Sequence, residues 1–158
     1  MEETAPRPID RWLGSYSEDH RNATNQAIHL ACVPLILWSV LAMLWTIPVP
    51  PALGQPGLWA GMAMFLTAIY YWRLSRPLGF GMLLAYIALG LLTHLLHRWL
   101  GLGLLWLAVA VFAIAWVGQF IGHHIEGRRP SFLTDLQYLL IGPVWTLSKL
   151  YRRLGLRW

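Results

Sequence analysis

Residues 28–49, IHLACVPLILWSVLAMLWTIPV, decide the fold because they form a long apolar run without a charged side chain. A helix that crosses a membrane needs about 20 predominantly apolar residues. Further apolar runs follow this one along the chain, so we expect an all-α membrane helix bundle with about four transmembrane helices. The four predicted spans cover residues 28–49, 57–72, 78–96 and 101–121.

The composition supports a membrane protein over a soluble one. Of the 158 residues, 57% are hydrophobic and 12% are charged, whereas soluble domains carry about 25% charged residues. So few polar side chains cannot cover a soluble surface, but lipid can cover an apolar one. We therefore expect residues 1–158 to form a single membrane-embedded domain.

The basic residues are distributed unevenly along the predicted topology. All 12 Lys and Arg residues except Arg98 fall in the N-terminal segment, the second loop or the C-terminal tail. With four spans these three segments share one side, which the positive-inside rule makes the cytoplasmic side. We expect both termini to be cytoplasmic, in a bacterial inner membrane or the endoplasmic reticulum. The net charge of +5 then reflects contact with membrane lipids, and no nucleic-acid partner is expected.

The segments before and after the spans predict amphipathic helices at the membrane surface. Ile9, Trp12, Leu13 and Tyr16 recur at helical spacing among charged residues. Residues 132–151 are apolar, are interrupted by a Gly-Pro pair and are followed by basic residues. We interpret both segments as interfacial helices.

Polar residues at the start of the first span form one candidate site. Asn25 and His29 are four residues apart and share a helical face. His20 can join them only if the helix breaks between, and Asn22 is a suitable N-cap residue for such a break. The alternative is that His20 is a surface residue and His29 an interfacial one.

A second polar cluster closes the fourth span. His123 and Glu126 are three residues apart, again on one face, while His124 points about 100° away around the helix. A polar helix end is the simpler interpretation of this cluster taken alone. The four-span topology, however, places both clusters on the cytoplasmic side, where imidazoles and a carboxylate can meet. Such ligands suit Fe(II), Zn or Mn, and the sequence does not choose among them.

His94 and His97 fall at the opposite end of the third span, a bilayer thickness from the other histidines. Their spacing permits a small second site, but we interpret them as an interfacial pair.

Several ordered blocks of the chain resemble the Mpo1-like family of small membrane proteins, the family of the yeast 2-hydroxy fatty acid dioxygenase. The blocks lie near both ends of the chain, while the middle spans match only in hydrophobicity. They comprise Trp12-Leu13, Tyr16, His20-Arg21-Asn22, Asn25, His29, Val33-Pro34, Gln119-Phe120-Ile121-Gly122-His123, Glu126-Gly127-Arg128-Arg129-Pro130-Ser131, Asp135-Leu136 and Ile141-Gly142-Pro143.

The resemblance implies an Fe(2+)-dependent dioxygenase of fatty-acid α-oxidation, which uses O₂ to shorten a 2-hydroxy fatty acid by one carbon. The family's metal positions map onto His20, His29 and His123, and its acidic position onto Glu126, which we expect to be a ligand or to support the ligands. We expect Asn25 and Glu126 to act in catalysis. Positively charged side chains nearby are suited to attract the substrate carboxylate; these are Arg21, Arg128 and Arg129.

Two other classes of function remain open at this point. The chain is alternatively a non-catalytic membrane protein, either a small transporter or a lipid-binding scaffold, with structural histidines. It is alternatively a haem-binding bundle with His29 and His123 as axial ligands.

Overall fold

The computed structural model describes residues 7–127 and 137–158, and within them the chain is entirely helical. This confirms the predicted all-α fold. The helices are α1 (Pro8–Glu18), α2 (Ala23–Trp45), α3 (Leu58–Leu74), α4 (Arg76–Leu100), α5 (Gly103–Glu126) and α6 (Tyr138–Arg153).

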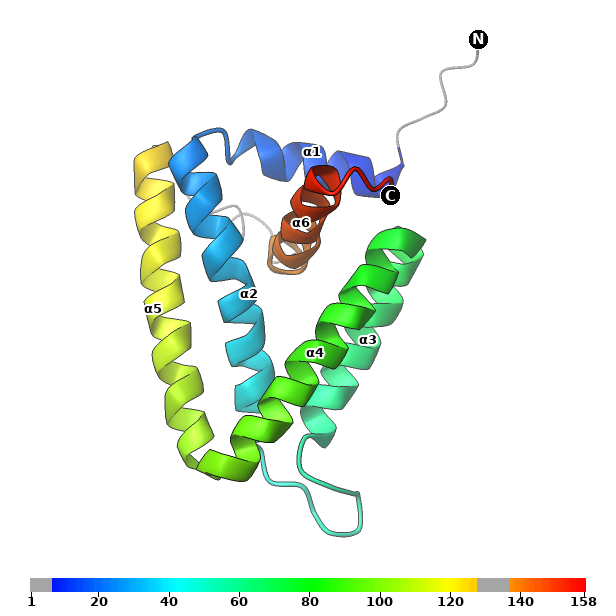
Figure 1. Cartoon of the computed structure of the whole chain (residues 1–158), viewed down its shortest axis with the longest axis vertical. Coiled ribbons are helices and arrows are strands. Elements are labelled where there is room, and N and C mark those ends of the chain that lie inside the picture. Colours follow the sequence, from blue (N-terminus) through cyan, green and yellow to red (C-terminus); the bar gives the residue numbers. More distant parts are fainter. Residues whose placement is uncertain (1–6, 128–136) are drawn as a thin grey trace.

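The long helices form two pairs that diverge toward one end of the molecule (Figure 1). In this view α2 and α5 run side by side, and α3 and α4 form a second antiparallel pair. The amphipathic helix α1 lies across the open end of the bundle, and α6 fills the space between α2 and α4. Two helices expected at the membrane surface therefore cover the end at which both candidate clusters lie.

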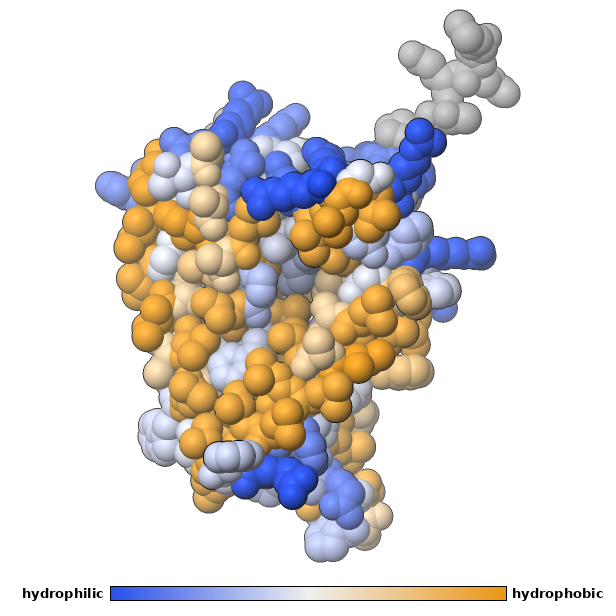
Figure 2. All heavy atoms as spheres, in the orientation of Figure 1, coloured by the Kyte–Doolittle hydropathy of each residue, from blue (hydrophilic) through white to orange (hydrophobic). Residues whose placement is uncertain are grey.

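Three helices, α2, α4 and α5, are long and apolar enough to cross a membrane. Helix α3 has 17 residues and is about 26 Å long at 1.5 Å per residue, a little short of a hydrocarbon core of about 30 Å. Four spans is therefore an approximate description. Figure 2 shows apolar residues along the sides of the bundle and hydrophilic ones gathered at its two ends.

The helix boundaries differ from the predicted spans because capping, rather than hydropathy, sets them. Helix α2 begins at Ala23, five residues before the apolar run, because the side chain of Asn22 accepts hydrogen bonds from the backbone N–H groups of Thr24 and Asn25. It ends at Trp45, ahead of the predicted end. Only Ser75 separates α3 from α4, so the predicted second loop, residues 73–77, is almost wholly helical.

Two glycines bring α2 and α5 into close contact. A Cβ atom at Gly118 would lie 2.7 Å from Sγ of Cys32, and one at Gly122 would collide with Oδ1 of Asn25. Small residues four apart let the backbones of membrane helices approach closely. This packing brings His29 on α2 within reach of α5.

The amphipathic helices are fixed by a common apolar core. Ile9 and Leu13 of α1 are buried with Ile141 and Trp145 of α6. The indole Nε1 of Trp145 donates a hydrogen bond to Ser17 Oγ at 2.9 Å. Helices at both ends of the chain are thus confirmed, and the predicted segment 132–136 lies outside the described residues. This core holds α1, and with it the turn that carries His20, against the spans.

Candidate metal centre

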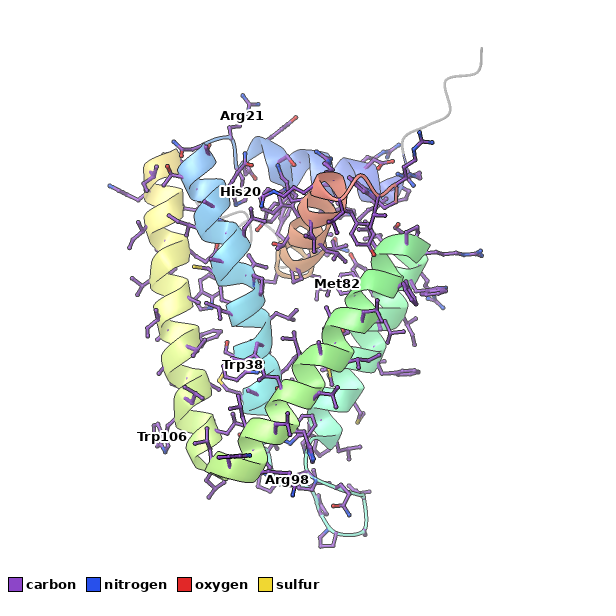
Figure 3. The ribbon with its side chains drawn as sticks, in the orientation of Figure 1. His20, Arg21, Trp38, Met82, Arg98 and Trp106 are labelled. Atoms are coloured by element: carbon purple, nitrogen blue, oxygen red, sulfur yellow. The ribbon has the colours of Figure 1, made fainter. Side chains whose placement is uncertain are left out.

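Three histidines from separate parts of the chain meet at the covered end of the bundle. His20 lies in the turn between α1 and α2, His29 in the first turns of α2, and His123 near the end of α5. One nitrogen of each ring lies within 4.8 Å of those of the other two. The side chains are 1%, 1% and 5% exposed, respectively. Figure 3 shows His20 at this end of the molecule, and Arg98 at the opposite end.

The predicted break in the helix places His20 beside His29. Helix α1 ends at Glu18, and the chain turns before Asn22 caps α2. The ring of His20 stacks on that of Tyr16 with centroids 4.2 Å apart and an interplanar angle of 9°. The ring is therefore held by the helix that precedes it, although His20 itself lies outside a helix.

Hydrogen bonds to backbone carbonyls fix the tautomers of two rings. Nδ1 of His20 lies 2.6 Å from the carbonyl oxygen of Tyr16, and Nδ1 of His29 lies 3.0 Å from that of Asn25. A carbonyl oxygen only accepts, so both Nδ1 atoms carry the proton. In the neutral rings, each Nε2 then presents a lone pair.

These two Nε2 atoms lie only 3.0 Å apart. Two lone pairs facing each other at this distance repel unless a proton or a cation lies between them. Burial lowers the pKa of His20, which disfavours the proton. Two nitrogen ligands about 2.1 Å from one ion, bound at a right angle, are about 3 Å apart. The spacing therefore fits a shared metal ion.

His123 completes the donor set. Its ring centroid lies 5.1 Å from that of His20 and 4.9 Å from that of His29. Nδ1 of His123 is buried and has no hydrogen-bond partner among the described residues. A buried nitrogen without a partner is costly, and a metal ion nearby is one way to satisfy it. Three neutral imidazoles suit iron, zinc or copper.

Glu126 holds the turn that carries His20. Its carboxylate accepts hydrogen bonds from the backbone N–H of Arg21 at 3.0 Å, from the backbone N–H of Asn22 at 2.9 Å and from Nδ2 of Asn25 at 2.9 Å. Glu126 is not a member of the three-histidine group. In this geometry the carboxylate joins the end of α5 to the turn before α2, and Asn25 is part of the same connection.

The side chains of Arg21 and His124 lie apart from this centre. Arg21 is exposed and points away from the molecule (Figure 3), and His124 is also exposed. Arg128 and Arg129 lie outside the described residues. At the far end of α4, His94 packs its ring against Trp45 at 6.0 Å.

A cavity of about 380 Å³ leads away from the three histidines into the bundle. Along α2 its lining extends from His29 to Leu44, about 22 Å at 1.5 Å per residue. Its walls are largely apolar, and two lining residues, Val40 and Leu139, are 37% and 44% exposed. The cavity therefore places a long apolar space beside the three histidines.

Gln119 is a site residue that the sequence analysis did not single out. It is 6% exposed, lines the cavity, and its Nε2 has no hydrogen-bond partner among the described residues. Its position four residues before His123 puts it on the same helical face. That spacing is the signal by which it could have been found.

Comparison with known proteins places the chain in a family. Residues 7–154 match the protein family described as 2-hydroxy-palmitic acid dioxygenase Mpo1-like. The chain belongs to the Mpo1-like family. It is 32% identical over 147 residues to the 2-hydroxy-palmitic acid dioxygenase MPO1 of Saccharomyces cerevisiae, a match covering 90% of this chain and 79% of that relative. No solved structure matches the chain.

The Mpo1-like match agrees with the resemblance that the sequence blocks indicate. It runs from the start of α1 through the end of α6, so it includes each element that contributes a histidine. The name of the yeast relative describes an oxygenase that acts on a 2-hydroxy fatty acid.

Proposed function

We propose that this chain is an iron-dependent dioxygenase that shortens 2-hydroxy fatty acids by one carbon. The observation that carries the proposal is the meeting of three buried imidazoles, two with Nε2 atoms 3.0 Å apart, in the wall of an apolar cavity. Membership of the Mpo1-like family supports the same class of reaction.

The proposed reaction balances with one O₂ and no other reductant. The bond between C1 and C2 breaks, C1 leaves as CO₂, and C2 becomes the carboxyl carbon of the shortened acid. One water is formed, and the four electrons that O₂ accepts all come from the substrate. A bound iron ion would supply the activation of O₂, for which nitrogen ligands with open positions beside them are suited.

The residues of the chain then have distinct tasks. His20, His29 and His123 would hold the ion. Gln119 can donate a hydrogen bond to the carboxylate or 2-hydroxyl of the substrate, because its unpartnered amide nitrogen lines the cavity beside them. Glu126 keeps His20 in place through the turn. We retain Arg128 and Arg129 as candidates to attract the carboxylate.

The cavity suits the acyl chain. Small-molecule sites are mostly apolar and of about 300–1,000 Å³, and this one has the length for a long chain. A fatty acid already dissolved in the bilayer would enter beside Val40 and Leu139 without crossing water. Its polar head would stay at the end where the basic residues gather, which we propose is the cytoplasmic face.

The geometry argues against the haem alternative. The ring centroid of His20 lies 4.2 Å from that of His29 and 5.1 Å from that of His123. A porphyrin bound between His29 and His123 would have to occupy the space that this third ring fills. The non-catalytic alternative predicts that no shortened acid is formed, so an analysis of the product tests it directly.

The test is to incubate the purified, iron-loaded protein with a 2-hydroxy fatty acid under O₂ and to determine the mass of the product. We expect an acid one carbon shorter and an equal amount of CO₂. The variant His29→Ala should lose this activity at least about a hundredfold, as expected when a metal ligand is removed.

The matched control is His124→Ala, because His124 is exposed and adjacent to His123 in the sequence. This variant should keep wild-type activity. An unshortened product with the wild-type protein, or full activity of His29→Ala, would contradict the proposed function.

A further inference from the structure

A second, open pocket lies where α3 ends and α4 begins. Its volume is about 510 Å³. None of its lining residues belongs to the metal centre or to the apolar cavity, so it is independent of the proposed oxidation. The lining consists of Arg7, Trp72, Arg73, Leu74, Ser75, Arg76 and Pro77.

The pocket carries positive charge that the described residues do not neutralise. Arg7 is already engaged: its Nε and Nη2 donate to the carboxylate of Asp10 at 2.8 and 3.0 Å, and its Nη1 donates to the carbonyl oxygen of Trp158 at 3.0 Å. Arg73 and Arg76 are exposed and form no ion pair with a described residue. These two guanidinium groups are therefore available to an anion.

Ser75 adds an unpartnered hydroxyl at the same place. It is 8% exposed, and its Oγ has no hydrogen-bond partner among the described residues. Ser75 is the N-cap residue of α4, yet its side chain does not cap the helix. A buried hydroxyl left without a partner is unfavourable, so a hydrogen bond from Ser75 Oγ to a ligand oxygen in the pocket would be favourable.

The N-terminus of α4 strengthens the attraction for an anion. A long helix carries a partial positive charge at this end, where its first N–H groups have no partner within the helix. Pro77, in the first turn, lacks one of these donors. The guanidinium groups and the Ser75 hydroxyl supply further hydrogen-bond donors. Together these donors match the several acceptor oxygens of a phosphate group.

The position of the pocket indicates which kind of molecule carries that phosphate. Trp72 lines the pocket and is 48% exposed, and exposed Trp at the end of an apolar helix is typical of the headgroup level of a membrane. We propose that Arg73, Ser75 and Arg76 bind the phosphate group of an anionic lipid.

Native mass spectrometry of the full chain in neutral detergent tests this site. The probe is dioleoyl phosphatidic acid, and dioleoyl phosphatidylcholine is the control lipid with the same acyl chains. We expect the wild-type protein to prefer phosphatidic acid by roughly tenfold, as charge-assisted hydrogen bonds to phosphate provide. Equal retention of both lipids would overturn the proposal.

Two variants locate the site. Arg73→Gln with Arg76→Gln should remove the preference, and Ser75→Ala should reduce it about threefold. Arg153→Gln with Arg157→Gln is the matched control, since it removes two exposed charges that do not line the pocket. An equal loss in both double variants would overturn the site in favour of a general charge effect.

A competition with inorganic phosphate distinguishes a lipid phosphate group from free phosphate as the ligand of this pocket. At the concentration of the lipid, we expect it not to displace phosphatidic acid. Displacement would overturn the assignment to a lipid. The melting temperature of each variant, measured in parallel, should match that of the wild type.

Discussion

Glu126 joins two parts of the site that are distant in the sequence. Its carboxylate binds the backbone N–H groups of Arg21 and Asn22 and the amide of Asn25. These donors lie between His20 and His29, so the carboxylate determines where the turn holds His20. We assign Glu126 the task of positioning a ligand rather than that of binding the ion.

This assignment predicts a partial effect for Glu126→Gln. The amide has one acceptor oxygen in place of two and no charge, so the turn should loosen and the affinity for Fe(2+) should fall roughly tenfold. Measuring the affinity for Fe(2+) by titration distinguishes a loosened turn from the loss of a metal ligand. Glu18→Gln, at an exposed position, is the control for the charge. Metal binding as weak as in His29→Ala would show that Glu126 is itself a ligand.

The sequence predicted the histidines better than it predicted their supports. The spacing of Asn25 and His29, and a break capped at Asn22, follow from helical geometry and capping preferences. The bonds of Glu126 could not be foreseen, because their donors are backbone N–H groups of a turn whose path only the folded chain defines. Gln119 was missed, although its spacing of four residues from His123 puts both on one helical face.

At the scale of the helices, we propose that the apolar cavity, which residues of all six described helices line, selects the substrate. Ala63 near the start of α3 lines it, as does Leu44 in the last turn of α2, 15 residues after His29. A larger side chain there would shorten the space available to an acyl chain.

Ala63→Phe should therefore lower kcat/KM for long 2-hydroxy acids by roughly tenfold relative to short ones. The comparison requires a series of acids of increasing length with each variant. Met62→Phe is the control, because Met62 is the neighbouring residue and is 48% exposed on the outer surface. Equal losses for long and short acids would place the acyl chain elsewhere.

Hydropathy predicted which segments become long helices, but not where they begin and end. Helix α2 starts among polar residues because Asn22 caps it, and α4 starts directly after Ser75. Which helices pack together also depends on detail that hydropathy ignores. The close contact of α2 with α5 depends on Gly118 and Gly122, where a Cβ atom would meet the facing helix.

For the whole molecule, the uneven distribution of Lys and Arg implies an orientation. Helix α1 and the end of α6 lie at one end of the bundle, and Arg98 lies at the other (Figures 1 and 3). The loop between α2 and α3 lies at the Arg98 end. From the positive-inside rule we propose that the first of these ends is cytoplasmic.

Cysteine labelling in intact bacterial cells checks this orientation. In a Cys32→Ser background, Leu53→Cys in the loop between α2 and α3 should react with a membrane-impermeant maleimide. Glu18→Cys, at the end of α1, should react only after the cells are permeabilised. Both sites are exposed, so the labelling of each site depends on which side of the membrane it faces. The reverse labelling pattern would invert the topology and place the metal centre on the outer face.

The most direct measurement is the iron content of the protein after anaerobic loading with Fe(2+). Since three imidazoles converge on one point, the wild-type protein should retain about one ion per chain. His20→Ala, His29→Ala and His123→Ala should each retain less than about a tenth of that, and His124→Ala should retain it all. Iron retained equally by all five proteins would contradict a shared site for these three histidines.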